Sequence, residues 1–210
     1  MPLVDYSQLF ILFVVLILSL TAHEAAHAWA ADLLGDPTAA GLGRLSFNPA
    51  IHVDPVGTII FPLVSFVSGF ALIGWARRVP VDVRQLGAGW RWKSALIAAV
   101  GPACSLGLAV VAALAIRVGA AATHSPFDAI IGPLLFRAVD LNVLLCVLHL
   151  LPVPPLDGGA ILAAALPAGA GAKWQAREWV GVIVMFVLLL SGALGFVLRP
   201  VRASLVGILL

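Results

Sequence analysis

The chain alternates between long apolar runs and short polar connectors, and the runs have the length of membrane-spanning helices. The first run predicts a helix over residues 8–34, which ends at Gly35-Asp36-Pro37, where a glycine is followed by a helix-breaking proline. At about 1.5 Å per residue, such a helix is long enough to cross a bilayer. Three later runs predict further long helices: 93–117, 129–151 and 176–198.

The pattern is less regular between the first and second of these helices. Residues 35–56 are polar and rich in glycine and proline, which predicts irregular structure. His52 and Asp54 in this stretch form either a carboxylate-oriented imidazole or, as the favoured interpretation, a turn held by local hydrogen bonds. Residues 57–75 are apolar but broken by proline, serine and glycine, which predicts a short span or a segment that enters the membrane and returns. Residues 74–83 are strand-like.

The composition places this pattern in a membrane. Of the 210 residues, 62% are hydrophobic and 10% are charged, and the mean hydropathy is +1.10, whereas a soluble domain is typically about a quarter charged. We therefore predict an all-α polytopic membrane protein with four to five transmembrane helices, a spanning or re-entrant segment at 57–75 and short strand-like loops. The net charge of +2 is too small to suggest a nucleic-acid partner, so the expected surroundings are the lipid bilayer.

The first helix carries the sequence His23-Glu24-Ala25-Ala26-His27. Residues four apart lie one turn apart on the same face of a helix, so the two imidazoles can hold one zinc ion. The glutamate next to the first histidine can then act as general base. The alternative is a pair of histidines hydrogen-bonded inside a helix bundle. A glutamate and two histidines are expensive to bury at hydrocarbon depth, which favours the functional interpretation.

A catalytic zinc site needs three protein ligands and one open position. Asp157 is the best third candidate, because it follows a proline-rich break, Leu151 to Leu156, that ends the 129–151 helix before the apolar run resumes through Leu166. Irregular backbone at membrane depth is tolerated only where protein or a water-filled cavity covers it. The alternative is that Asp157 only caps a turn before Gly158-Gly159.

Taken in this order, these segments resemble the site-2 protease family of intramembrane zinc metalloproteases. The resemblance covers roughly residues 9–166 and looks like a compact branch of the family without PDZ or CBS domains. It is carried by the His-Glu-x-x-His sequence, by Gly101-Pro102 and by Leu-Pro-Val-Pro-Pro-Leu-Asp-Gly-Gly at 151–159. Two further segments support it: the loop Asn48 to Thr58 and the segment Gly74 to Val81.

The resemblance implies that His23, His27 and Asp157 bind one Zn²⁺ per chain and that Glu24 is the base. It also implies a single integral-membrane metalloprotease domain over 1–210, with a core at 9–166 and an accessory C-terminal span at 176–198. The family usually has an asparagine where this chain has His149, and that position is thought to bind substrate or stabilise the oxyanion. A histidine can donate one hydrogen bond there, or it can contact the metal. The glycine-proline motif usually ends in asparagine, and here it ends in Ser105.

These features predict a multi-pass protein of the cell membrane that cleaves membrane proteins in or near a transmembrane helix, as in regulated intramembrane proteolysis. An unwound substrate would pair as an added strand with the stretch near Trp75 to Val83. The alternatives are a catalytically weakened zinc-binding scaffold for partner helices and a metal transporter. If 57–75 re-enters, the basic connector residues share one face, which the positive-inside rule makes cytoplasmic: Arg44, Arg77, Arg78, Arg84, Arg91, Lys93, Lys173 and Arg177. The same choice lets His27 and Asp157 meet.

Overall fold

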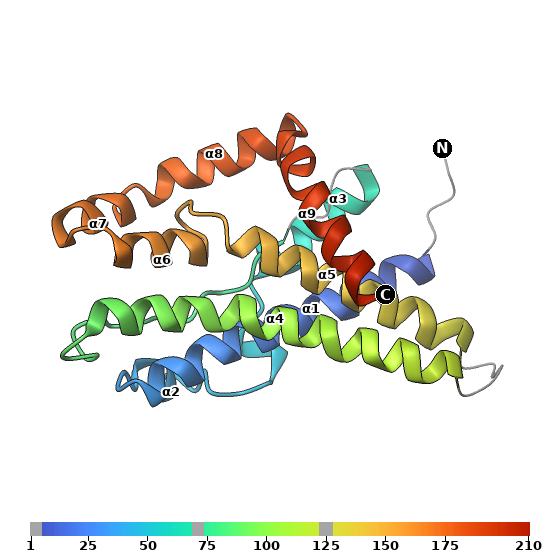
Figure 1. Ribbon diagram of the computed structural model, residues 1–210, viewed down its shortest axis with the longest axis horizontal. Coiled ribbons are helices and arrows are strands. Elements are labelled where there is room, and N and C mark those ends of the chain that lie inside the picture. Colours follow the sequence, from blue (N-terminus) through green and yellow to red (C-terminus); the bar gives the residue numbers. More distant parts are fainter. Residues whose placement is uncertain (1–5, 69–73, 122–127) are drawn as a thin grey trace.

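The computed structural model describes residues 6–68, 74–121 and 128–210. All regular structure in these ranges is helical, as predicted, and no strand occurs in them (Figure 1). Three helices are long and apolar enough to cross a membrane, and the number rises to four if the bent C-terminal pair counts as one span. The long helices are α1 (Tyr6–Leu33), α4 (Trp90–Ala121) and α5 (Asp128–His149).

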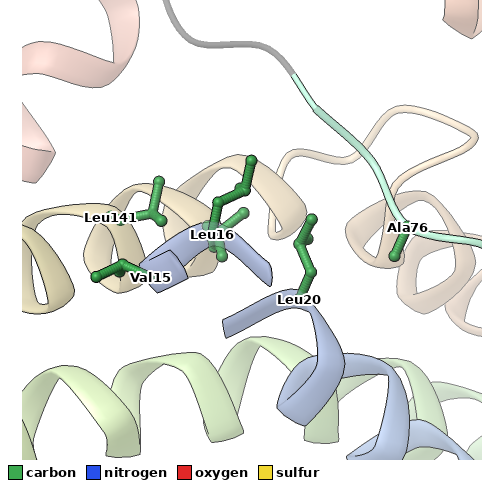
Figure 2. Close-up of a cluster of buried hydrophobic side chains, with 6 residues drawn as sticks. Val15, Leu16, Leu20, Ala76 and Leu141 are labelled. Carbon is green, nitrogen blue, oxygen red and sulfur yellow. The ribbon is translucent and has the colours of Figure 1, made fainter. Parts of the chain in front are cut away.

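Helices α1 and α5 run in the same direction, and α4 runs against both. Ser19 and His23 of α1 lie beside Asn142 and His149 of α5, so residue numbers rise together along the pair. At the end of α1, the Lys93 ammonium at the start of α4 donates to the Leu34 carbonyl oxygen at 3.1 Å. A cluster of buried apolar side chains joins α1 to α5, and it also takes in Ala76 of the extended segment (Figure 2).

Helix α5 ends inside the molecule, and after a break the chain forms another helix, which is short. The break at residues 150–156 contains Pro152, Pro154 and Pro155, and three missing backbone donors within four positions are too many for a helix to continue. Helix α6 (Asp157–Ala165) then runs beside α4 towards its first turn, where Arg91 donates to the Ala164 carbonyl oxygen at 2.7 Å. The predicted break therefore occurs, and the irregular chain that forms it brings Asp157 into the interior of the molecule.

The segment at 57–75 returns to the place where it starts. It begins in a π-helical turn, η2 (Pro55–Ile60), and continues as α3 (Phe61–Ser68). The Trp75 amide donates to the Gly57 carbonyl oxygen at 3.1 Å, and the Thr58 hydroxyl donates to the Trp75 carbonyl oxygen at 2.7 Å. Because the two ends are hydrogen-bonded to each other, they lie side by side, which is the arrangement that the re-entrant alternative requires. The strand-like stretch after it is extended, but it has no strand partner in the described part of the chain.

The apolar run predicted as one C-terminal span at 176–198 forms two helices that meet at a sharp bend. Helix α8 (Glu178–Leu190) ends at Ser191-Gly192, where Gly192 adopts a left-handed backbone with φ of 76°, and α9 (Ala193–Leu209) leaves at 81° to α8. The last residues belong to α9. Helix α9 packs on α4 and α5 through Leu205, Val206 and Leu209, and the Arg202 guanidinium makes a bidentate ion pair with Asp140 of α5.

The remaining helices are short and lie in the connectors. Helix α2 (Thr38–Gly41) and the turn η1 (Pro49–Ile51) interrupt the irregular stretch at 35–56, and α7 (Ala168–Gln175) joins α6 to α8. Asp36 fixes the start of this stretch, because its buried carboxylate accepts hydrogen bonds from the amides of Thr38 and Asp82. That contact ties the end of α1 to the far end of the extended segment.

Candidate metal centre

Three ligand atoms from two helices converge inside the molecule. The Nε2 atoms of His23 and His27 are 3.1 Å apart on neighbouring turns of α1. Asp157, the first residue of α6, places Oδ2 3.2 Å from His23 Nε2 and Oδ1 3.4 Å from His27 Nε2. Ligands held at about 2.0–2.1 Å around a tetrahedral zinc ion are separated by roughly 3.3–3.4 Å. The three residues therefore have the separation that such an ion requires, and they form a candidate metal site.

The outer nitrogen of each histidine has its own partner. His27 Nδ1 lies 2.8 Å from the Ile97 carbonyl oxygen, which can only accept, so this nitrogen carries the proton. His23 Nδ1 lies 3.0 Å from the Ser105 hydroxyl, whose oxygen can accept a hydrogen bond from a protonated Nδ1. With both Nδ1 atoms protonated, two Nε2 lone pairs and a carboxylate face one point. Such a donor set is unfavourable without a cation at its centre, and a hydrogen bond from the outer ring nitrogen is typical of metal-binding histidines.

Helix α4 leaves room for this cluster at one residue. A Cβ atom built on Gly101 would overlap His27 Nε2 and would lie 2.6 Å from His23 Nε2. Only glycine at this position lets the α4 backbone come so close to both ligand atoms. The Gly101-Pro102 sequence therefore packs against the candidate metal site, and Ser105 reaches the same site one turn later. By helical rise, His23 lies about 15 Å from the end of α1, which is half of a hydrocarbon core of about 30 Å.

Glu24 is also held by a contact from another part of the chain. Its buried side chain accepts a hydrogen bond from the Val79 amide at Oε2, with a distance of 2.9 Å. The second oxygen, Oε1, has no protein partner in the part of the chain that the structure describes. Glu24 thus has one carboxylate oxygen fixed by the extended segment and one available for proton transfer.

The extended segment is bound along one edge only. The amides of residues 75, 77 and 79 and the carbonyl groups of 75 and 77 all have partners on this edge. The partners of Arg77 are the His52 carbonyl oxygen at 2.8 Å and the Arg44 guanidinium at 3.2 Å. Between these positions Ala76 is buried in the apolar cluster, whereas Arg78 is exposed and its amide and carbonyl groups have no hydrogen-bond partner among the described residues. Alternation of this kind is a property of extended chain, and it leaves an open edge beside Glu24.

Arg44 supports this arrangement as a buried cation. Its side chain is 6% exposed, and no carboxylate within the described ranges forms an ion pair with it. Burial and the neighbouring Arg77 cation lower the pKa of the Arg44 guanidinium, and the attraction of Glu24 opposes this shift. Arg44 and Glu24 are therefore near neighbours, because they bind successive inward-facing positions of the same extended segment.

His149 lies beside the three ligand atoms and binds the aspartate. Its Nδ1 atom is 2.8 Å from Asp157 Oδ2, and its ring centroid is 4.4 Å from that of His23. A carboxylate accepts, so the Nδ1 atom of His149 donates to Asp157. The predicted donation to an oxyanion would require protons on both ring nitrogens. The geometry favours a positioning role, in which His149 holds the Asp157 carboxylate towards the two histidines.

His52 and Asp54 lie apart from this centre and serve the local turn. The Asp54 carboxylate accepts from the amides of Val56 and Gly57 at the start of η2, as an N-cap. His52 Nε2 donates to the Ser46 carbonyl oxygen at 2.8 Å. The favoured interpretation of a turn held by local hydrogen bonds is thus confirmed. Sequence reasoning did not find the roles of Ser105, Arg44 and the Val79 amide. Each of the three binds a group that is distant along the chain, so no local pattern reveals the contact.

The fold and the site define a polytopic helical membrane protein with a candidate cation site made of two buried histidines and a partly buried aspartate. Its relatives include "Putative zinc metalloprotease YwhC" of Bacillus subtilis, which is 37% identical over 90% of this chain and 84% of the relative. Another is "Putative zinc metalloprotease Rip2" of Mycolicibacterium smegmatis, 33% identical over 90% of this chain and 71% of the relative. No family model and no solved structure matches the chain. The chain belongs to the family of these relatives, the site-2 protease family.

Proposed function

We propose that this protein is an intramembrane zinc metalloprotease that hydrolyses peptide bonds in or near transmembrane segments of other membrane proteins. The observation that carries the proposal is the convergence of His23, His27 and Asp157, with Glu24 on the next residue and its Oε1 atom free. The names of the relatives support a zinc metalloprotease. The apolar helices around the site support a substrate that arrives from the bilayer.

The residues of the site divide the chemistry among them. His23, His27 and Asp157 would hold the zinc ion, which would acidify a water molecule and polarise the scissile carbonyl group when bound. Glu24 Oε1 accepts the proton of the attacking water and delivers it to the leaving amine nitrogen. Ser105 and His149 are positioning residues, because the first orients His23 and the second orients Asp157.

The extended segment supplies a place for the substrate backbone. A transmembrane helix hides its carbonyl groups in its own hydrogen bonds, so it must unwind before hydrolysis. The open amide and carbonyl groups of Arg78 would then pair with the unwound chain as with an added strand. Because the neighbouring Val79 amide binds Glu24, pairing in this register would bring the substrate backbone close to the base.

A backbone substitution tests this pairing. Arg78→Pro removes the open amide at 78, whereas Arg78→Ala keeps the amide and removes only the exposed ion pair with Glu178. We expect Arg78→Pro to raise KM at least about tenfold, because a strand is lost, and Arg78→Ala to stay within about twofold. Equal kinetics of the two variants, with zinc content unchanged, would count against strand addition.

We place the protein in the cell membrane, with the end that carries Arg84, Arg91 and Lys93 in the cytoplasm, according to the positive-inside rule. In this orientation the enzyme would act in regulated intramembrane proteolysis. The decisive experiment reconstitutes the purified protein with a membrane-protein substrate. Wild type should cleave, and both Glu24→Gln and chelator-treated protein should not. Substrate binding without cleavage by the zinc-loaded wild type would indicate a scaffold, and metal flux across proteoliposomes would indicate a transporter.

A further inference from the structure

A second polar feature lies at the end of the molecule where α4 begins and α6 ends. A cavity of about 640 Å³ opens between these two helices, and its lining includes Trp90, Arg91 and Trp92 of α4 together with Ile161 and Ala164 of α6. The two helices lie side by side at this end in Figure 1. None of the groups of the metal centre lines this cavity, so it is a separate site.

The cavity combines one cation with two exposed indole rings. Trp90 is 42% exposed and Trp92 is 58% exposed, which suits the headgroup level of a bilayer, where tryptophan side chains gather. Arg91 donates one N–H to the Ala164 carbonyl oxygen, which holds the guanidinium at the cavity, and its other donors have no protein partner within the described ranges. No acidic residue lines the cavity. The site is therefore positively charged and has guanidinium donors to spare.

We propose that this cavity binds an anionic phospholipid, with the phosphodiester on Arg91 and the glycerol and upper acyl chains against Trp90, Trp92 and Ile161. Guanidinium groups bind phosphate through paired, charge-assisted hydrogen bonds. Basic pockets between helices near a membrane surface are suited to acidic headgroups. The lipid would bridge α4 and α6 beside the existing Arg91–Ala164 contact. Because α6 carries Asp157 at its other end, the bound lipid would also stiffen the helix that supplies the carboxylate.

Quenching of tryptophan fluorescence by brominated lipids tests the site directly. The purified protein is placed in nanodiscs that contain either dibrominated phosphatidylglycerol or dibrominated phosphatidylcholine in a non-brominated phosphatidylcholine background. The Trp90→Phe/Trp92→Phe double variant identifies the part of the signal that comes from these two rings. We expect the phosphatidylglycerol to bind about fivefold more tightly at these rings, the preference that one arginine at a membrane surface provides.

Two variants decide the outcome. Arg91→Gln should abolish the preference, whereas Lys173→Gln, which removes a charge at the same end outside the cavity lining, should keep it. Arg91→Lys retains the charge and should keep part of the preference, which separates loss of the site from loss of folding. Equal quenching by the two lipids in wild type, or an unchanged preference in Arg91→Gln, would overturn the proposal. Relief of the quenching by millimolar inorganic phosphate would assign the cavity to a free anion and would overturn it as well.

Discussion

Substitution of Gly101 by alanine gives the sharpest prediction, because packing and helix propensity act in opposite directions. Alanine is favoured over glycine inside a helix by roughly 0.5–1 kcal/mol, so propensity alone predicts a more stable α4. The new Cβ atom, however, would overlap His27 Nε2 and lie 2.6 Å from His23 Nε2. Ordinary contact begins at about 3.4 Å, so His23 Nε2 would have to retreat by about 0.8 Å.

A displacement of this size is large for a metal ligand. Ligand distances in a functional site are held within about 0.2 Å of their ideal values. Loss of a single supporting hydrogen bond already weakens metal binding by about 10- to 100-fold. We therefore expect Gly101→Ala to weaken zinc binding by at least 10- to 100-fold, which corresponds to about 1.4–2.8 kcal/mol.

The matched control is Gly107→Ala on the same helix, where a Cβ atom would meet nothing within 4 Å. Zinc affinity is measured for both variants by competition with a chromophoric chelator, and zinc content is measured by mass spectrometry. Helical content and monodispersity in detergent show whether each variant folds. If Gly101→Ala folds and binds zinc as tightly as Gly107→Ala does, then the candidate metal centre does not lie where the structure places it.

Four further outcomes are expected. Ser105→Ala should weaken zinc binding about tenfold in the same chelator competition, whereas Ser105→Thr keeps the hydroxyl on His23 and should stay closer to wild type. Glu24→Gln should bind zinc within about threefold of wild type but cleave at least about 100-fold more slowly in single-turnover assays, and wild-type cleavage would exclude Glu24 as the base. Arg44→Gln should release the Arg77 carbonyl group and raise KM several-fold, with zinc affinity unchanged. A changed zinc affinity would show that Arg44 acts on the metal site instead. The last prediction concerns topology and uses single cysteines in a background without native cysteines. Phe47→Cys and Arg84→Cys should react with an impermeant maleimide from the same membrane face, and Val118→Cys should react from the other face. Labelling of positions 47 and 84 from opposite faces would refute re-entry.

The sequence determined those features that depend on near neighbours along the chain. The length and polarity of the apolar runs predicted a helical membrane protein, because a helix satisfies its own backbone within one segment. The placement of His23 and His27 on one face of α1 followed from helix geometry alone. The break before Asp157 followed from the three prolines at 152–155, since three prolines in four positions end any helix.

The tertiary structure decided everything that joins distant segments. Helix periodicity cannot show that Ser105 reaches His23, that the Val79 amide reaches Glu24 or that Gly101 lies against both ligand atoms, because each contact depends on how separate helices pack. The C-terminal bend is a similar case. The apolar run through 176–198 looks continuous, but the left-handed turn at Gly192 redirects the chain, and the Arg202–Asp140 ion pair and the apolar face of α9 then hold it against α5. The hydropathy pattern along the chain indicates whether each segment prefers water or lipid. The hydrogen-bond or ion-pair partner of each polar group depends on how the helices pack.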